Sequence, residues 1–414
     1  MKIAFINQPF DQIYGGNRNS IALWSYRAAT ELKNDHEVSI YGSRFGNVDQ
    51  IEEDGITYQG FDIEPDNRRL KFLRFLKIIF NGKRAFFATP WYFGEYYRSL
   101  VRAVAEKNFD VVHIHNFPQV VEMVKSHCKE GCRIVLHMHC DWLIQLHQPW
   151  VEKALRQVDL VVGCSDYVVD GIKRKYPKYS HKCRRIFNGF DSSGFYKSPK
   201  EGVPDHINGP YMLYVGRGSP EKGLHLATRA FQKVADKYPE LKLVCIGGIG
   251  AAPRAFLYDL VDEDVRKDME PGMYEPYEEY VFDGIAPDVR SRIQMIDHVD
   301  YNSLVGFYQN SKLLIVPTVC HEAFGMPVLE AIACGTPIVA SKCGGIPEFF
   351  KDGTDGFLFE RGNLKSLIEK IEILLENPVP LRPDEELQSS FRLFSWKSIT
   401  KELSMCYQSL AKIG

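Results

Sequence analysis

The stretch from Leu313 to Phe359 constrains the fold of this 414-residue chain more than any other stretch. It begins with the apolar run Leu313–Val316, which is long enough for a buried strand, and a second such run follows at Ile338–Ala340. Between them, Met326–Cys334 predicts a helix, because Pro327 falls in the first turn, where a missing amide hydrogen costs nothing. Two buried strands joined by a helix form a parallel unit, so the sequence predicts an α/β domain.

Two glutamates accompany the predicted helix. Glu322 lies in the loop just before it, and Glu330 lies one turn inside it. The unpaired amides at a helix N-terminus favour an anion such as a diphosphate, and carboxylates accept hydrogen bonds from sugar hydroxyls. The pair therefore suits a nucleotide sugar. Taken alone, the same pair also fits a structural interpretation, in which Glu322 caps the helix and Glu330 is a solvated surface residue.

Short motifs around these glutamates resemble the family 4 glycosyltransferases, a large group of retaining enzymes. The motifs are Glu322 and Glu330 at their spacing, the run Ala323–Pro327, Gly335–Pro337 and Gly344–Glu348. Each motif alone is weak, but the set is specific, and the resemblance extends more thinly to the first residues and the last helix. It implies an α/β, GT-B fold: two facing Rossmann-like, doubly wound parallel-sheet domains with an interdomain cleft and a C-terminal crossover helix.

The length of the chain suits two domains better than one core. Residues 196–210 are rich in proline, glycine and charge, which is typical of an interdomain linker. By the resemblance, residues 1–195 form an N-terminal acceptor-side domain and residues 211–390 a C-terminal nucleotide-sugar-binding domain. Residues 391–414, whose Phe394-Ser395-Trp396 start matches the family, form a helix that packs back on the N-terminal domain.

The composition excludes several other classes of protein. The formal net charge is −2, so the chain lacks the basic excess of a nucleic-acid-binding protein. The ten cysteines are scattered without a C-x-x-C pair, which indicates reduced thiols and no cysteine metal site. Met1 leads directly into a strand pattern without a signal peptide, and no apolar run is long enough to span a bilayer. We therefore expect a cytoplasmic protein.

The segment Arg68–Phe80 is basic on one helical face, with Lys71, Arg74 and Lys77, and apolar on the other. Such a helix can lie on an anionic membrane surface, which would make the protein peripheral at the inner face of the membrane. The alternative is an ordinary helix that packs its apolar face on the sheet. The sequence leaves both interpretations open.

The first predicted strand, Lys2–Asn7, is not followed by a dinucleotide-binding motif. G-x-G-x-x-G is absent, and the strand Val38–Tyr41 ends in Gly42 rather than an acid, which excludes a nicotinamide-dependent dehydrogenase. Gly15 and Gly16 in the loop allow the backbone to approach a ligand closely. By the resemblance, Gly16 contacts the diphosphate of the donor through main-chain amides.

Polar side chains follow two further predicted strands of the first domain, Asp110–His115 and Arg133–His137. Parallel sheets bind ligands beyond the carboxyl ends of their strands, so His137, His139 and Asp141 lie where chemistry is expected. By the resemblance, a histidine after the second of these strands contacts the donor sugar. We assign this role to His139, and His137 is its competitor because of the His-x-His spacing.

Two further expectations concern the histidines and a possible metal. A zinc ion held by His137, His139 and Cys140 would need three well-placed ligands, which the sequence does not establish. His113 and His115 are expected to be strand-end residues whose ring nitrogens are satisfied by the backbone.

Two cations follow the strand Tyr211–Gly216, which opens the second domain. Arg217 and Lys222 lie on a glycine-containing loop and suit a diphosphate, although without the glutamates they would be ordinary solvated cations. By the resemblance they are the phosphate-binding arginine and lysine of the family. His298 ends another short segment, near where the nucleotide base is expected.

Residues 251–292 form a stretch longer than the family usually has at this place. They contain Asp262-Glu263-Asp264, which matches the Asp-x-Asp motif of metal-dependent GT-A transferases. The surrounding charge pattern is typical of an exposed helix, so we expect no metal there.

Together these features imply a retaining glycosyltransferase that needs neither a metal nor a cofactor. It would move a hexosyl or N-acetylhexosaminyl group from a nucleoside diphosphate sugar, UDP favoured, to a glycan or lipid-linked acceptor in cell-envelope polysaccharide or glycoconjugate synthesis. The expected catalytic residues are His139, Glu322, Arg217 and Lys222, and the expected substrate-binding residues are Gly16, Phe324, Gly325, Glu330 and His298. Two alternatives stay open: a nucleotide-sugar-binding scaffold without catalysis, and a nucleotide-sugar epimerase on the same fold.

Overall fold

The computed structural model describes residues 1–12, 20–73, 82–191, 207, 209–250, 256–270, 273, 276–297, 299–379 and 382–412. Gly16, His298 and residues 74–80 of the basic amphipathic segment lie outside the described residues, and the predicted linker is described only at 207, 209 and 210. The chain divides into two compact units, Met1–Phe190 with Arg392–Gly414, and Asp191–Phe391.

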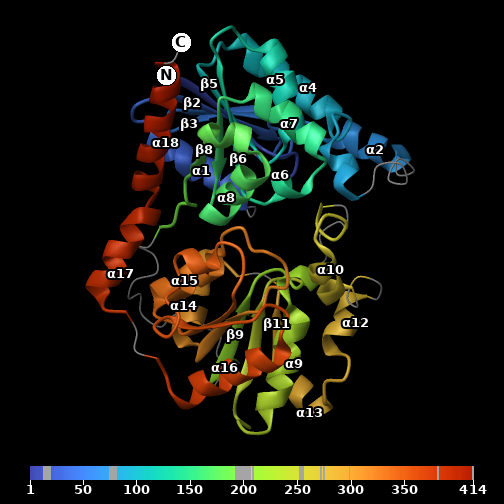
Figure 1. The fold of residues 1–414 in the computed structure, drawn as a ribbon, viewed down its shortest axis with the longest axis vertical. Helices are drawn as coiled ribbons and strands as arrows, with labels where there is room; N and C mark the ends of the chain where they lie inside the picture. The colour runs from blue at the N-terminus through green and yellow to red at the C-terminus, as the bar shows by residue number, and fades with distance from the viewer. Residues whose placement is uncertain are drawn as a thin grey trace. The chain divides into compact units, whose positions relative to one another are not determined.

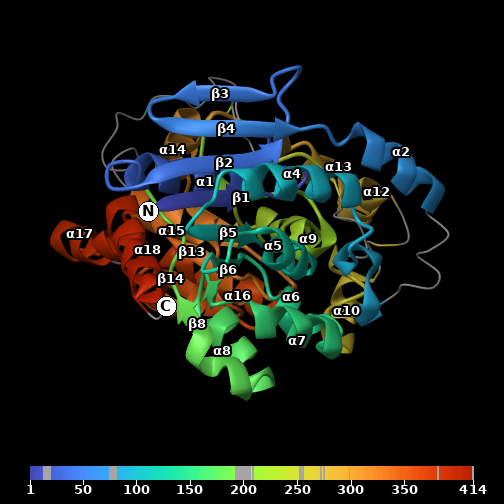
Figure 2. The same ribbon diagram turned by 90° about the horizontal axis from the view of Figure 1, so that it is seen from above.

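The first unit is built on an eight-stranded sheet, and Figure 2 shows the succession of its strands. All neighbouring strands are parallel except β3, which pairs antiparallel with β4 at the edge. The spatial order is β3 (Gln50–Glu53), β4 (Ile56–Phe61), β2 (Glu37–Ser43), β1 (Lys2–Ile6), β5 (Val111–His115), β6 (Arg133–Met138), β7 (Leu160–Gly163) and β8 (Cys183–Arg185). The central strands are buried and mostly apolar, as expected of parallel strands covered on both faces, with histidines near the ends of β5 and β6.

Helices cover both faces of this sheet, with α1 and α18 on one face and α4, α5 and α7 on the other (Figure 2). The helices of the first unit are α1 (Ser20–Leu32), α2 (Glu64–Phe72), α4 (Gly94–Glu106), α5 (Val121–His127), α6 (Trp142–Gln145), α7 (Gln148–Gln157), α8 (Asp166–Lys175) and α18 (Trp396–Ala411). This arrangement is the doubly wound one that the family resemblance implies.

Helix α18 lies beside α1 in the first unit (Figure 1), although its residues come from the end of the chain. Ser395 caps it by accepting a hydrogen bond from the amide of Ser398. Ile399, Leu403 and Tyr407 recur at helical spacing and are buried in the apolar core between α1, α18 and the sheet.

The second unit contains a six-stranded sheet in which every described pair of neighbours is parallel. The spatial order is β11 (Ile293–Ile296), β10 (Lys242–Ile246), β9 (Tyr211–Val215), β12 (Leu313–Val316), β13 (Ile338–Ser341) and β14 (Gly356–Phe359). Its helices are α9 (Leu224–Ala235), α10 (Glu263–Met269), α12 (Tyr277–Phe282), α13 (Pro287–Arg290), α14 (Tyr301–Asn310), α15 (Met326–Cys334), α16 (Leu364–Glu376) and α17 (Asp384–Phe391).

The long stretch 251–292 contributes to the core of the second unit where it is described. Val265 of α10, Val281 of α12 and Val289 of α13 are buried in the same apolar cluster as the inner side of α9. The stretch is therefore a structural part of the second unit and not only an exposed, charged helix.

Short 3-10 turns join many of these elements, at Gly82–Arg84, Phe86–Ala88, Pro118–Val120, Pro177–Lys182, Pro220–Lys222, Ile346–Glu348 and Arg392–Phe394. The pair Gly344-Gly345 follows a predicted strand, where the sequence is compatible with the start of another helix, but it precedes only the single turn Ile346–Glu348. None of the helices in the described part of the chain is both long and apolar enough to cross a membrane.

Candidate active site

Two loops of the second unit meet at the carboxyl ends of the neighbouring strands β9 and β12. The carbonyl oxygen of Glu221 accepts hydrogen bonds from the Val319 amide at 3.0 Å and from the Thr318 hydroxyl at 2.9 Å. Gly223 has φ +71°, and a Cβ there would lie 1.9 Å from the carbonyl oxygen of Pro317. The two loops are therefore fastened backbone to backbone, which brings their side chains together.

Lys222 and Glu322 form an ion pair across these loops. The Lys222 ammonium donates to the Glu322 carboxylate at 2.5 Å, and the side chains are 32% and 19% exposed. Burial by itself lowers the pKa of Lys222, but the nearby Glu322 carboxylate outweighs burial, so the pKa is raised above its usual value. Lys222 consequently stays cationic over the whole physiological pH range.

The backbone of Glu322 is held by the glycine pair that follows β13. The Gly345 amide donates to the carbonyl oxygen of Glu322 at 2.8 Å. Gly344 has φ +57°, and a Cβ on it would lie 1.8 Å from the same oxygen. Only glycine permits both the left-handed backbone and this approach, so the pair fixes the loop that carries Glu322.

Arg217 is oriented by a buried carboxylate. Its guanidinium donates to Glu221 at 2.5 Å, and the Glu221 side chain is 4% exposed whereas that of Arg217 is 48% exposed. The ion pair holds one edge of the guanidinium while the rest of it remains open to a ligand. Ser219 lies close enough to accept a further hydrogen bond from Nε of Arg217, at 3.4 Å.

Phe324 and Gly325 lead directly into helix α15. The Phe324 side chain is buried and its ring packs on Phe349, so its main-chain amide, and not its ring, is the group suited to a ligand. Gly325, at φ +102°, is the N-cap of α15, and its Cβ position lies 3.7 Å from Cγ of Glu322. The amides at the start of α15 therefore lie beside Glu322, as the sequence pattern predicts.

Glu330 lies inside helix α15, and its hydrogen-bond partner is not a member of the Lys222–Glu322 ion pair. It accepts a hydrogen bond from the Tyr308 hydroxyl of α14 at 2.8 Å. Burial raises the pKa of Glu330 from 4.5 to about 7, and the tyrosine bond offsets this only in part. The carboxyl group thus titrates near neutral pH.

The tripeptide Asp262-Glu263-Asp264 has a structural role in the second unit. Asp262 is the N-cap residue of α10, and Asp264 pairs with the Arg361 guanidinium at 2.6 Å. Arg361 also donates to the carbonyl oxygen of Val319 at 2.7 Å. The Asp264 carboxylate therefore fastens α10 to the loop after β12 through this arginine.

His139 follows β6 in the first unit, at the carboxyl edge of that sheet. Its amide donates to the side-chain oxygen of Asn116 at 2.8 Å, which holds the backbone in place. Nε2 of its ring lies 3.0 Å from Nδ1 of His115, and Nδ1 lies 3.3 Å from Oδ1 of Asn188. Burial lowers the pKa of His139 to about 4, so the imidazole is neutral near pH 7.

His113 and His115 are hydrogen-bonded by side chains, which corrects the expectation that the backbone satisfies their ring nitrogens. His113 bonds through Nδ1 to the Tyr407 hydroxyl of α18 at 2.6 Å and through Nε2 to His137 at 3.1 Å. His115 bonds to Ser25 at 3.0 Å as well as to His139. The histidines that the sequence places at the ends of strands are thus members of a buried network of side-chain hydrogen bonds.

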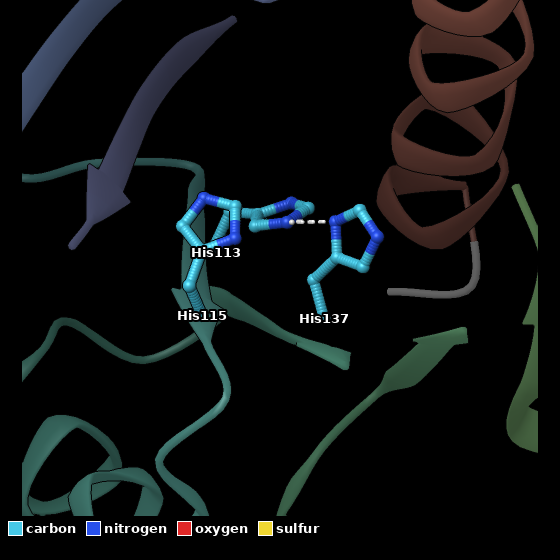
Figure 3. Close-up of side chains that lie close together, drawn as sticks. All are labelled: His113, His115 and His137. Carbon is cyan, nitrogen blue, oxygen red and sulfur yellow. Dashed lines mark hydrogen bonds between the residues drawn. The ribbon is translucent and has the colours of Figure 1, made fainter. Parts of the chain in front are cut away.

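Among the described residues, His113, His115 and His137 form the one group close enough to share a metal ion, with one ring nitrogen from each within 4.8 Å of the others (Figure 3). Figure 3 shows the rings of neighbouring strands turned toward one another. A bound cation would have to replace hydrogen bonds that His113 and His115 already make. Hydrogen bonding therefore accounts for this geometry without a metal.

Two family models match the chain, glycosyltransferase family 4 over residues 25–193 and glycosyl transferases group 1 over residues 206–390. The chain belongs to the family 4 glycosyltransferases. It is 24% identical over 411 residues to the lipopolysaccharide 1,2-N-acetylglucosaminetransferase of Salmonella typhimurium, covering 97% of this chain and 96% of the relative. It is also 21% identical to spore coat protein SA of Bacillus subtilis, covering 99% of each chain.

Solved structures resemble this glycosyltransferase over its whole length. Sucrose-phosphate synthase from Thermosynechococcus elongatus matches with a TM-score of 0.71 at 18% identity, covering all of both chains. HepE of Anabaena, in complex with UDP and glucose, matches with a TM-score of 0.68 at 17% identity, covering 99% of this chain and 100% of that one. These matches confirm the predicted GT-B fold.

In the glycosyltransferase, the predicted site residues fall into separate groups. Lys222, Glu322, Phe324 and Gly325 lie together, and Arg217 lies on the same loop as Lys222 with Glu221 as its partner. The group around His139 belongs to the first unit, and Glu330 bonds to Tyr308 within the second. Gly16 and His298 remain predictions, because both lie outside the described residues.

Sequence reasoning missed three partners of these residues: Glu221, Tyr308 and Asn188. Asn188 precedes a glycine, a pair typical of a structural turn, yet its side chain lies 3.3 Å from Nδ1 of His139. The signal that could have found Glu221 is its spacing of four residues from Arg217 on the same loop.

Proposed function

We propose that this glycosyltransferase transfers a hexosyl or N-acetylhexosaminyl group from a UDP-sugar to a glycan or lipid-linked acceptor, with retention at the anomeric carbon. The observation that carries the proposal is the Lys222–Glu322 pair at the carboxyl ends of adjacent strands, with Arg217 on the same loop. A cation and a carboxylate side by side fit an activated sugar, which is anionic at its diphosphate and rich in hydroxyls at its ring.

The relatives support UDP as the nucleotide. HepE is solved in complex with UDP and with UDP-glucose, and a trehalose-phosphate synthase of similar fold is described as UDP-forming. The Salmonella relative is named for N-acetylglucosamine transfer to lipopolysaccharide, which supports a cell-envelope acceptor. We extend both properties to this chain as part of the proposal.

In the proposed mechanism the second unit binds the donor. Lys222 and Arg217 would neutralise the charge that builds up on the departing diphosphate, which is electrostatic stabilisation of the transition state. Because its pKa is raised, Lys222 is protonated when the donor arrives. Glu322 and the amides of Phe324 and Gly325 would hold sugar hydroxyls, and Gly16 would add main-chain contacts to the diphosphate.

Glu330 would accept hydrogen bonds from the ribose hydroxyls, and His298 would lie near the base. Hydroxyl donors favour the charged form of a carboxyl group, so ribose binding would lower the pKa of Glu330 from its present value of about 7. Tyr308 already donates to one carboxylate oxygen and would fix the orientation of the other.

Retention would follow from attack on the face that the diphosphate leaves. The acceptor oxygen forms a bond to the anomeric carbon while the bond to the diphosphate oxygen breaks, and that oxygen takes the acceptor's proton. This mechanism uses no metal and no cofactor.

Contact with an anionic membrane through Arg68–Phe80 remains a proposal based on the sequence. The side chain of Phe72, which belongs to the described part of this segment, is 81% exposed.

The experiment that tests the proposal is NMR of purified protein with a panel of UDP-sugars, with and without acceptor glycans. We expect a new α-linked product from an α-linked donor, and we expect Glu322→Gln to slow its formation at least about a hundredfold. Glu279 is exposed on α12, so the Glu279→Gln variant serves as the matched control and should transfer the sugar at the normal rate.

Other results would contradict the proposal in distinguishable ways. Binding of a UDP-sugar without any product would favour a scaffold. Conversion of the donor without an acceptor would favour an epimerase, and a β-linked product from an α-linked donor would contradict retention.

A further inference from the structure

His139 has hydrogen-bond partners on both ring nitrogens within the first unit. The bond to His115 is short, at 3.0 Å between Nε2 of His139 and Nδ1 of His115, and His115 is a fully buried residue of strand β5. The contact to Asn188 is longer, at 3.3 Å, and Asn188 lies in an irregular segment after β8 and is partly exposed. The two sides of the ring are therefore held to different degrees.

Two aromatic side chains pack against the ring of His139. His137 stacks on His139 with 4.1 Å between ring centroids, and the indole of Trp24 lies edge-on at 5.7 Å. The Asn116 side chain fixes the His139 amide. No ionised group among the described residues bonds to the ring, so its hydrogen bonds alone decide which nitrogen carries the proton.

These bonds form one chain: Asn7 bonds to Ser25 at 2.6 Å, Ser25 to His115 at 3.0 Å, His115 to His139, and His139 to Asn188. Four bonds need four protons, but one hydroxyl and two neutral imidazoles supply three. One of the two terminal amides must therefore present its NH2 group. In either arrangement, His115 and His139 carry their proton on the same ring nitrogen.

We propose that His115 is a positioning residue that acts through His139: it holds Nε2 of His139 and couples the tautomer of His139 to its own, so that Nδ1 is the nitrogen open to a sugar hydroxyl. Asn188 occupies that nitrogen when no ligand is bound, and a hydroxyl of the donor sugar replaces it. The inference rests on the proposed function and on the role that the family resemblance implies for His139, which is contact with the donor sugar.

A pair of substitutions at position 115 separates positioning from a general structural effect. Asn has an amide atom near the place of Nδ1 of His115, so His115→Asn keeps a partner for His139 and loses the one for Ser25. Gln has its amide near the place of Nε2, so His115→Gln keeps the partner for Ser25 and loses the one for His139. Both variants introduce an uncharged amide of similar size, and their melting temperatures show whether both fold.

The kinetic arm measures kcat and KM for the donor. We expect His115→Asn to keep kcat within about threefold of the wild type, and His115→Gln to lower kcat at least about tenfold, with a smaller change in KM. Equal kcat values for the two folded variants would overturn the proposal, as would normal transfer by His139→Ala.

The second arm uses 15N-labelled histidine and two-bond 1H–15N NMR spectra of the imidazoles, which need no substrate. We expect His115 and His139 to show one and the same tautomer in the wild type, and His139 to show a mixture in His115→Gln. Opposite tautomers in the wild type would overturn the pairing whatever the activity. Matched tautomers in a protein that transfers no sugar would instead contradict the proposed function while supporting the pairing.

Discussion

At the scale of single residues, the candidate site depends on main-chain groups that approach more closely than a side chain would allow. Gly223 lies against Pro317, and Gly344 lies against Glu322, each in a left-handed backbone conformation. Because these contacts join loops that follow different strands, they place Lys222 beside Glu322 more firmly than the ion pair alone could. A partly exposed ion pair by itself contributes little to stability.

Replacing Gly344 by alanine tests this dependence. We expect Gly344→Ala to lose donor binding and to lower the free energy of unfolding more than Gly353→Ala does. Gly353 has φ +83° with nothing within 4 Å of its Cβ position, so its substitution adds backbone strain of about 1–2 kcal/mol without a clash. Urea unfolding followed by circular dichroism measures both variants, and equal losses of stability would contradict this role of Gly344.

The partly buried carboxyl of Glu330 makes stability depend on pH. Its pKa of about 7 in the folded protein exceeds the ordinary value of 4.5, so the folded state binds this proton more tightly than the unfolded chain does. Its contribution to stability is therefore complete below about pH 4.5 and is lost as the pH rises through 7. Asp11, whose pKa burial also raises to about 7, acts in the same direction.

We expect Glu330→Gln to remove part of the decline in stability between pH 5 and pH 8, by an amount on the order of 2–3 kcal/mol. The measurement is the free energy of unfolding of the unliganded protein at both pH values. Glu376→Gln, on the exposed side of α16, is the control and should leave the decline unchanged. An undiminished decline in Glu330→Gln would show that this carboxyl is not the group responsible.

Much of the candidate site was predictable from single residues because motif spacing identifies the charged groups themselves. The motifs alone identify Lys222 and Glu322, whose side chains lie in contact at 2.5 Å. The motifs do not identify the partners of the other site residues, because a partner is chosen by packing: Tyr308 is 22 positions from Glu330, and Asn188 is 49 positions from His139. No local pattern marks such contacts.

At the scale of elements, helix α18 joins the end of the chain to the core of the first unit. Leu403 is fully buried and Tyr407 reaches His113, whereas Met405 on the opposite side of the helix is 58% exposed. The helix therefore contributes both apolar surface and a buried hydrogen bond to a sheet whose strands come from the first half of the chain.

We expect Leu403→Ala to destabilise the first unit by about 2–5 kcal/mol, because it leaves a cavity in the core. Met405→Ala should cost less than about 0.5 kcal/mol, as exposed substitutions do. All five tryptophans, Trp24, Trp91, Trp142, Trp150 and Trp396, lie in the first unit, so tryptophan fluorescence reports its unfolding separately. Similar costs for the two substitutions would argue against the helix as part of this core.

Strands were the elements that the sequence predicted best, because buried parallel strands are short apolar runs bounded by turn residues. Leu313–Val316 is found at its predicted bounds as β12. The pair Gly344-Gly345 does not open a helix, because it serves a close backbone contact and is followed by only the Ile346–Glu348 turn. The antiparallel edge strand β3 carries no comparable pattern, since its residues are mostly exposed.

At the scale of the whole molecule, both units are α/β sheets of the same general type, yet they carry different chemistry. The first unit holds a neutral histidine network at its strand ends, and the second holds an arginine, a lysine and carboxylates. This asymmetry agrees with a donor whose charged diphosphate binds the second unit. Similarity of fold alone would not show which of the two units binds the diphosphate.

The most direct test of this account is calorimetric titration of UDP into the wild type, Lys222→Ala and Lys233→Ala. Lys233 lies exposed on α9, so its substitution removes the same charge from the second unit without changing the candidate site. We predict that the wild type and Lys233→Ala bind UDP with the same affinity and that Lys222→Ala binds it at least about tenfold more weakly. Wild-type affinity in Lys222→Ala, or no binding of UDP to the wild type, would contradict the account.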